Sequence, residues 1–314
     1  MCRPMALADR KVSFTKPAYR QVFADVFRLT VVSEMQMNSF SWHHLNEWHL
    51  QWPALVALVL MGLGYAMRVR RLERRSVPWS PWRSAAFAAG LLVTVLATQS
   101  VIGVYDMNYL SFHMIQHLLL IMVAAPLFAL SRPLDLLRFS GGVGAQRFLD
   151  SGLMRVVTHP ITGFAAYFIF IPVAHLSGLF TLMMQHTAVH HAEQVAFVVI
   201  GYLFFRVAFG SEQGRTLHPG LRLLFVMAAV PVDTFTGLAL MMSNHLPFNG
   251  YLATTPMGTS TSAALANVHL GGAIMWIGGD ALMLLACIPI VVQWVRWETK
   301  EAKRTDAELD ALGL

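Results

Sequence analysis

Seven long apolar segments constrain this chain more than any other feature of its sequence. They are 16 to 29 residues long, and a helix needs ~20 residues to cross the ~30 Å hydrocarbon core of a bilayer. Because lipid offers the backbone no hydrogen-bond partners, such segments must be helical. We place them at residues 53–68, 84–104, 109–130, 160–180, 186–209, 219–242 and 267–295. The sequence therefore predicts an all-α, polytopic membrane protein, a bundle of seven transmembrane helices.

The composition agrees with a membrane protein and argues against a nucleic-acid partner. Hydrophobic residues make up 56% of the chain and charged residues only 13%, about half the charged share of a typical soluble domain. The net charge of +6 comes largely from short loops between apolar segments, where Lys and Arg indicate topology. With only Cys2 and Cys287, the chain has no disulfide framework and no C-x-x-C metal or redox pair.

The loop charges predict the orientation in the membrane. Arginines are frequent after the first, third and fifth segments, and Lys and Arg follow the seventh. The loops at 105–108, 181–185 and 243–266 contain neither Lys nor Arg. Because basic residues are retained on the cytoplasmic side, we expect the N-terminus outside and the C-terminus in the cytoplasm.

The chain divides into three parts by composition. Residues 1–41 contain no apolar run that suits a signal peptide, and we expect the first ~35 of them to be either an upstream start-site artefact or a disordered tail. Residues 42–295 form the predicted seven-helix transmembrane domain. Residues 296–314 form a charged tail, predicted to be cytoplasmic.

The thirteen histidines lie mostly on one side of the predicted membrane. Only His159 and His218 fall on the cytoplasmic side. The other eleven fall at or near the outer ends of the segments: His43, His44, His49, His113, His117, His175, His186, His190, His191, His245 and His269. A single outer histidine, such as His43 or His245, is best explained as an interfacial side chain that reaches water. The one-sided distribution as a whole indicates a functional site on the outer side.

Two of the segments begin with polar stripes at helical spacing. The stripes are His113, Gln116 and His117 on the third segment and His186, His190 and Glu193 on the fifth. Residues four apart share one helix face, and imidazoles at membrane depth need polar partners. We therefore expect the two stripes to form opposite walls of one site, roughly 5–15 Å below the outer surface.

The donor types in this region favour copper. Imidazole with thioether, and without cysteine, suits copper and above all Cu(I) better than Mg²⁺ or Ca²⁺. The predicted ligands are His113, His117, His186, His190, His175, His269 and Met114. Asp106, Gln116 and Glu193 are predicted to support them as hard ligands or as acceptors that orient an imidazole. The alternative for the methionine is ordinary packing, its usual role in helices.

Two carboxylates lie deeper, in the middle of the sixth and seventh segments. Asp233 and Asp280 are each roughly 17 Å from a helix end, and no Lys or Arg shares their depth. Either they are protonated and hydrogen-bonded to neighbouring helices, or they form an intramembrane relay for protons or metal ions.

Three functions fit these residues. The first is copper handling or metal delivery. The second is a membrane b-type haem protein. Two haems would need a histidine pair near each membrane face, and the inner-side His159 and His218 lie in loops or at helix entries. This weakens a two-haem arrangement. The third is a proton or metal transporter that uses Asp233 and Asp280. The sequence contains no nucleotide-binding motif, nucleophile elbow or H-E-x-x-H, so we expect no enzyme.

The stretch Ser111–Leu120, continuing into Ala124-Ala125-Pro126-Leu127, resembles a family signature, as do His186, His190 and Glu193. The family is the CtaG-type assembly factors of caa(3)-type cytochrome c oxidase, seven-span proteins of the bacterial plasma (inner) membrane. The resemblance covers about residues 42–295. It implies a non-enzymatic part in respiratory chain biogenesis, with copper delivered at the outer face. It also implies oxidase subunits as partners, and a copper chaperone as a further candidate.

Overall fold

The computed structural model describes residues 47–210 and 217–312, and every element in these ranges is a helix. The all-α fold is therefore confirmed for the described residues. The chain separates into two units, residues 1–39 and 40–314, and all the described helices belong to the second. The predicted N-terminal tail, residues 1–41, lies outside the described residues, and so do His43 and His44.

Within the described ranges, six helical stretches are long and apolar enough to cross a membrane: Trp52–Glu73, Pro81–Tyr105, Leu110–Ser140, Thr187–Phe209, Pro219–Met241 and Thr261–Ala311. The predicted segment 160–180 is instead a pair of helices, α10 (Pro160–Leu176) and α11 (Gly178–Gln185), bent by 70°. Counting that pair as one broken span gives seven. The seven-span count and the orientation therefore stay predictions.

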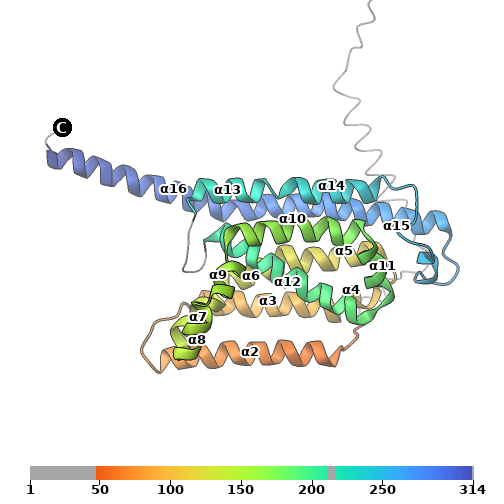
Figure 1. Ribbon diagram of the computed structural model, residues 1–314, viewed down its shortest axis with the longest axis horizontal. Helices are drawn as coiled ribbons and strands as arrows, with labels where there is room; N and C mark the ends of the chain where they lie inside the picture. Colours follow the sequence, from red (N-terminus) through yellow and green to blue (C-terminus); the bar gives the residue numbers. More distant parts are fainter. Residues whose placement is uncertain (1–46, 211–216, 313–314) are drawn as a thin grey trace, which may run out of the picture. The chain divides into compact units, whose positions relative to one another are not determined.

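The elements follow one another without strands (Figure 1). The first half contains α2 (Trp52–Glu73), α3 (Pro81–Gln99), α4 (Val101–Tyr105), α5 (Leu110–Leu118), the π-helix η3 (Leu119–Ala124), α6 (Ala125–Ser131), α7 (Pro133–Ser140), α8 (Val143–Leu149) and α9 (Gly152–Val157). After α10 and α11 come α12 (Thr187–Phe209), α13 (Pro219–Met227), α14 (Val230–Met241), the 3₁₀ turn η4 (Tyr251–Ala253), α15 (Thr261–Ala273), the π-helix η5 (Ile274–Gly278) and α16 (Gly279–Leu312).

The bend between α10 and α11 has a local cause at Ser177. Its backbone is extended, with φ of −120° and ψ of 178°, so the helix cannot continue through it. Its hydroxyl donates to the carbonyl of Val173 at 2.6 Å and accepts from the amide of Leu179 at 3.1 Å. One side chain thus ends α10 and caps α11, which compensates the unpaired backbone groups at the break.

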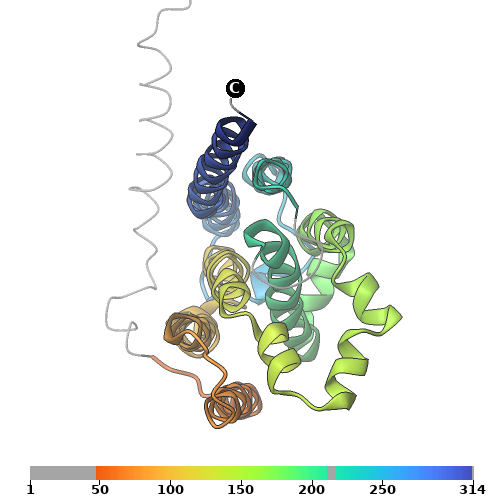
Figure 2. The ribbon, with the colours of Figure 1, turned by 90° about the vertical axis from the view of Figure 1, so that its left-hand side faces the viewer.

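The helices that carry the two polar stripes lie in the middle of the bundle. Figure 2 shows α5, α6 and α12 surrounded by the other helices, with α2 at one edge. Helix α12 packs against α6, η3 and α10, while α6 also packs against α3. The close approach depends on Gly201, where an added Cβ would lie 2.9 Å from the carbonyl oxygen of Ile121. The stripe residues are therefore buried in protein, except His186, which is exposed.

The predicted charged tail continues the last helix. α16 extends to Leu312, and residues 296–311 are exposed. This stretch is rich in Ala, Glu and Lys, which have high helix propensity. The charged residues thus form a helical extension beyond the last apolar segment.

Candidate metal centre

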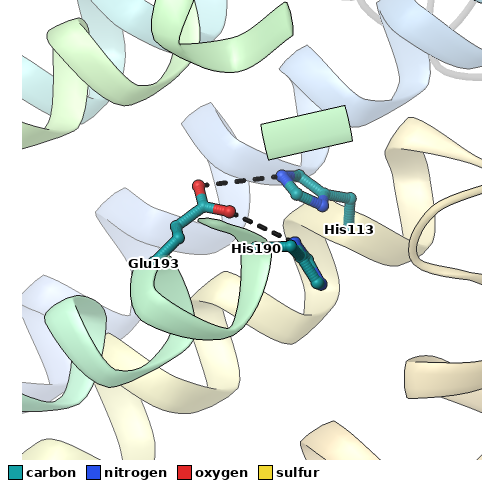
Figure 3. Close-up of side chains that lie close together, drawn as sticks. All are labelled: His113, His190 and Glu193. Carbon is teal, nitrogen blue, oxygen red and sulfur yellow. Dashed lines mark ion pairs between the residues drawn. The ribbon is translucent and has the colours of Figure 1, made fainter. Parts of the chain in front are cut away.

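The stripes on α5 and α12 meet in the core. His113 from α5 and His190 and Glu193 from α12 each offer a ligand atom, and these atoms all lie within 4.8 Å of one another. Figure 3 shows both imidazoles pointing toward the Glu193 carboxylate. The three side chains are buried, with residue exposures of 0%, 2% and 4% in that order. The centre is thus enclosed by protein.

Glu193 is the centre of the cluster. Its Oε1 lies 3.4 Å from His117 Nε2 and 3.9 Å from His113 Nε2, and its Oε2 lies 3.3 Å from His190 Nδ1. None of these buried atoms makes a hydrogen bond in the structure. For His113 this holds for both ring nitrogens. Since buried polar groups are nearly always hydrogen-bonded, this group of unpaired donors and acceptors marks a site.

The neighbours of His117 direct its lone pair toward Glu193. The backbone carbonyl of Ile171 accepts from His175 Nδ1 at 2.8 Å. His175 Nε2 then has no proton and accepts from His117 Nδ1 at 3.1 Å. In the neutral ring, His117 Nε2 is left as an acceptor, because an imidazole carries one proton. That acceptor faces the Glu193 carboxylate.

Asp106, which follows α4, has the same effect on His190. Its Oδ2 accepts from Gln116 Nε2 at 2.5 Å and lies 3.0 Å from His190 Nε2. An ionised carboxylate can only accept, so a ring that bonds Asp106 carries its proton on Nε2, whereas the Gln194 amide nitrogen, 3.0 Å from the same atom, would need an acceptor there. The charge of the Asp106 carboxylate favours the proton on Nε2. The lone pair on His190 Nδ1 then faces Glu193 Oε2. A carboxylate that fixes the tautomer of an imidazole is the usual partner of a metal-binding histidine.

The electrostatics of the cluster favour a proton or a metal ion among its donors. Two imidazole acceptors converge on a carboxylate away from water, where their mutual repulsion is weakly screened. A proton on one ring, or a metal ion among the donors, removes that repulsion. Imidazole nitrogen and carboxylate oxygen are both donors that metals such as copper and zinc accept. The arrangement can therefore hold either a shared proton or a metal ion.

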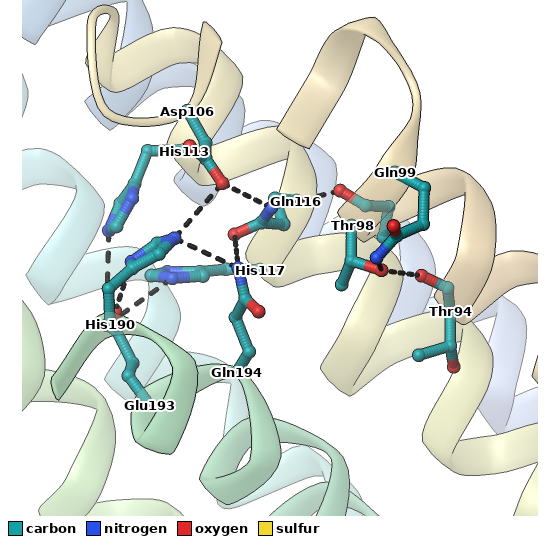
Figure 4. A network of polar contacts seen from close by, with 11 residues as sticks. Thr94, Thr98, Gln99, Asp106, His113, Gln116, His117, His190, Glu193 and Gln194 are labelled. Atoms are coloured by element: carbon teal, nitrogen blue, oxygen red, sulfur yellow. Dashed lines mark hydrogen bonds and ion pairs between the residues drawn. The ribbon is translucent and has the colours of Figure 1, made fainter. Parts of the chain in front are cut away.

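A hydrogen-bonded network fixes the cluster to α3 (Figure 4). Gln116 Nε2 also donates to the carbonyl of Ala97 at 3.0 Å. The Gln194 amide donates to Gln116 Oε1 at 3.2 Å and lies 3.0 Å from His190 Nε2. Gln194 is absent from the predicted site, although it follows His190 by four residues and so shares its helix face.

The structure does not bring every predicted ligand to this centre. His186 is exposed and directly precedes α12, with an extended backbone (φ −130°, ψ 106°). His269, on α15, contacts the carbonyl of Ser243 at 2.7 Å. His175 joins the centre only through His117. Met114 is buried and lines a small cavity with His117 and His175.

Both mid-membrane carboxylates have protein partners. Tyr167 donates its hydroxyl proton to Asp233 at 2.6 Å, and Thr234 lies 2.9 Å and 3.1 Å from the two oxygens of Asp280. Asp233 also lines the small cavity that His117 and His175 line. These contacts suit hydrogen-bonded links between helices, and the relay stays a prediction.

Comparison with known proteins gives relatives without an assigned role. The chain is 28% identical over 281 residues to an uncharacterized protein of Mycobacterium bovis, which covers 85% of this chain and 42% of the relative. An uncharacterized protein of Mycobacterium tuberculosis has the same figures, and one of Mycobacterium leprae is 26% identical over 267 residues, 81% of this chain and 40% of the relative. The chain thus spans about two fifths of the length of the curated relatives it matches. No solved structure matches the chain.

A family model identifies the larger group. The model described as cytochrome c oxidase caa3 assembly factor matches residues 63–297. That range runs from α2 into α16 and includes all the residues of the candidate centre. The match confirms the resemblance seen in the helix α5 motif, and the chain belongs to the family of cytochrome c oxidase caa3 assembly factors.

Proposed function

We propose that this protein assists the assembly of cytochrome c oxidase by holding a copper ion as cargo. The ligands would be His113, His117, His190 and Glu193, with Asp106 orienting His190. One observation carries the proposal: imidazole and carboxylate acceptors converge on one buried point and make no hydrogen bonds there. The family supplies the oxidase, whose subunits are the proposed partners together with a copper chaperone.

The donor chemistry supports copper. For a given set of nitrogen and oxygen donors, divalent copper binds more strongly than the other first-row divalent ions. The proposal places His186 and His269 outside the ligand set, because neither lies at the cluster. Met114 stays a candidate thioether ligand beside His117, one that would favour Cu(I).

The position of the centre along the helices suits the exchange of cargo. His113 lies three residues after Leu110, the first residue of α5, and His190 lies three residues after Thr187, the first of α12. Both are therefore about 5 Å along their helices. The loop charges predict that these helix ends lie at the outer face of the membrane. A partner on that side would have a short path to the ion.

Copper content tests the proposal directly. Full-length protein would be purified after growth with copper, and its metals counted by mass spectrometry. We expect bound copper in the wild type and in His186→Ala, and its loss in His113→Ala, His190→Ala and Glu193→Gln. His186→Ala is the matched control, because that histidine belongs to the same stripe by spacing and is exposed. A wild-type protein without copper, or equal copper in all variants, would overturn the proposal.

The two other functions have their own signatures. A Soret band in the purified protein would favour the haem alternative. Ion flux into vesicles that requires Asp233 and Asp280 would favour a transporter. The proposal expects neither.

A further inference from the structure

A groove of about 410 Å³ runs between α2 and the rest of the bundle. Its walls come from α2, α3, α6, α7 and α12 and are almost entirely apolar. Met61 and Val199 at its rim are 41% and 47% exposed on the surface that lipid would cover. Phe87 and Phe128 form its buried floor. The groove is thus accessible from the hydrocarbon layer.

The groove exists because α2 contacts the bundle along only part of its length. Of its 22 residues, only Tyr65 and Leu72 are buried. Tyr65 fixes the helix by stacking on Phe87 at 3.9 Å and donating to the carbonyl of Ser131 at 3.0 Å. At Gly64, the residue before Tyr65, an added Cβ would have no atom within 4 Å. The absence of a side chain at Gly64 therefore keeps the groove wide.

One end of the groove carries positive charge. Arg68 is the charged residue among those described as its lining, and its guanidinium donates to Ser140 Oγ at a long 3.4 Å. The exposed Arg70, Arg71, Arg74 and Arg75 follow at the same end of α2, where Glu73 is the one acidic residue. The loop charges predict that this end lies on the cytoplasmic side, where the leaflet is anionic.

We propose that this groove binds an anionic phospholipid, with an acyl chain along the apolar walls and the headgroup phosphate on Arg68. Guanidinium groups bind phosphate through paired, charge-assisted hydrogen bonds. Basic pockets between transmembrane helices on the cytoplasmic side are suited to anionic headgroups.

The size of the groove selects a lipid over a helix of a partner protein. A transmembrane helix ~10 Å wide and ~30 Å long occupies on the order of 2,000 Å³. The groove of about 410 Å³ is too small to enclose such a helix and suits a single hydrocarbon chain. This site is independent of the proposed metal centre, since the lining of the groove includes none of the proposed ligands.

Lipid retention measures the occupant. Full-length protein would be extracted in mild detergent and its bound phospholipids quantified by mass spectrometry. It would then be returned to phosphatidylcholine vesicles containing spin-labelled phosphatidylglycerol, and the immobilised label measured. Gly64→Phe fills the groove and Arg68→Gln removes its charge. Ala66→Phe and Arg70→Gln make the same changes on α2 outside the lining.

We expect Arg68→Gln to lower bound phosphatidylglycerol about fivefold, the effect of one lost arginine contact at a membrane surface. Gly64→Phe should lower it as well, because its ring takes the place of the acyl chain. The two control variants should retain it, and all four should bind copper as the wild type does. Equal retention in all variants would overturn the proposal. So would equal immobilisation of phosphatidylcholine label, or a co-purified protein in place of lipid.

Discussion

Replacing Asp106 tests the electrostatic design of the centre more sharply than removing a ligand. Its Oδ2 is shared between Gln116 Nε2 at 2.5 Å and His190 Nε2 at 3.0 Å. Asp106→Ala removes both contacts in a site where Gln116 and His190 are 0% and 2% exposed. Gln116 keeps its bond to the carbonyl of Ala97, whereas His190 Nε2 loses the acceptor that fixes its tautomer.

Two magnitudes follow for Asp106→Ala. Leaving one buried donor unpaired should lower the free energy of unfolding by about 1–3 kcal/mol. Losing the group that orients a metal-binding imidazole should weaken copper binding by about 10–100-fold, or about 1.4–2.8 kcal/mol. In Asp106→Asn an amide oxygen can still accept, so we expect most of the stability to return. The copper affinity of Asp106→Asn should lie between those of the wild type and Asp106→Ala, because the acceptor is kept and its charge is lost.

Thermal unfolding in detergent and competition with a copper chelator would measure the two quantities. Asp150→Ala is the control: it removes an exposed carboxylate that pairs with Arg138 at 3.0 Å, and such pairs contribute about 0–1 kcal/mol. Its copper affinity should match the wild type. If Asp106→Ala is destabilised and yet binds copper with wild-type affinity, the orienting role assigned to Asp106 is wrong.

Three further changes test other contacts. Gly201→Leu should destabilise the protein by about 1–3 kcal/mol or more, because its Cβ would lie 2.9 Å from the backbone of η3; the same change at Gly144, which has open space, should be nearly neutral in thermal unfolding. His175→Phe should weaken copper binding about 10–100-fold, since His117 loses its acceptor, and chelator competition would show it. Tyr167→Phe removes a 2.6 Å bond to a buried carboxylate and should cost about 1–3 kcal/mol; no loss of thermal stability would contradict that.

The fold could be predicted where segment length alone decides it. The predicted segment 186–209 matches α12 (Thr187–Phe209) to within one residue. The bend at Ser177 could not be predicted in this way, because the apolar profile continues across it and a single hydroxyl makes the break. The helical extension of α16 could not be predicted from apolar length either, because it begins where the apolar run ends.

For the site, the sequence predicts how deep along its helix each side chain lies. It does not predict which neighbouring helix that side chain faces. His113, His117, His190 and Glu193 were placed on two facing stripes at one depth, and the structure brings them together. His186 fits the same spacing, but helical periodicity holds only inside a helix, and α12 begins one residue later. His269 lies near the start of α15, but it contacts the carbonyl of Ser243 and not the cluster on α5 and α12. Which helices are adjacent depends on packing, and spacing along one helix does not report it.

The π-helix η3 determines which side chains of the continuous helix α5–η3–α6 face α12. His113, His117, Ile121 and Ala125 all contact α12 at a strict interval of four residues. In a regular α-helix, twelve residues at that interval drift by about 120° around the axis. A π turn takes more residues per turn, and it offsets this drift just after His117. Deleting one residue within Leu119–Ala124 would restore α-helical winding and rotate the histidines away from Glu193 or Ala125 away from Gly201. The extra residue of the π turn thus allows Ala125 on α6 and the imidazoles on α5 to face α12 at the same time.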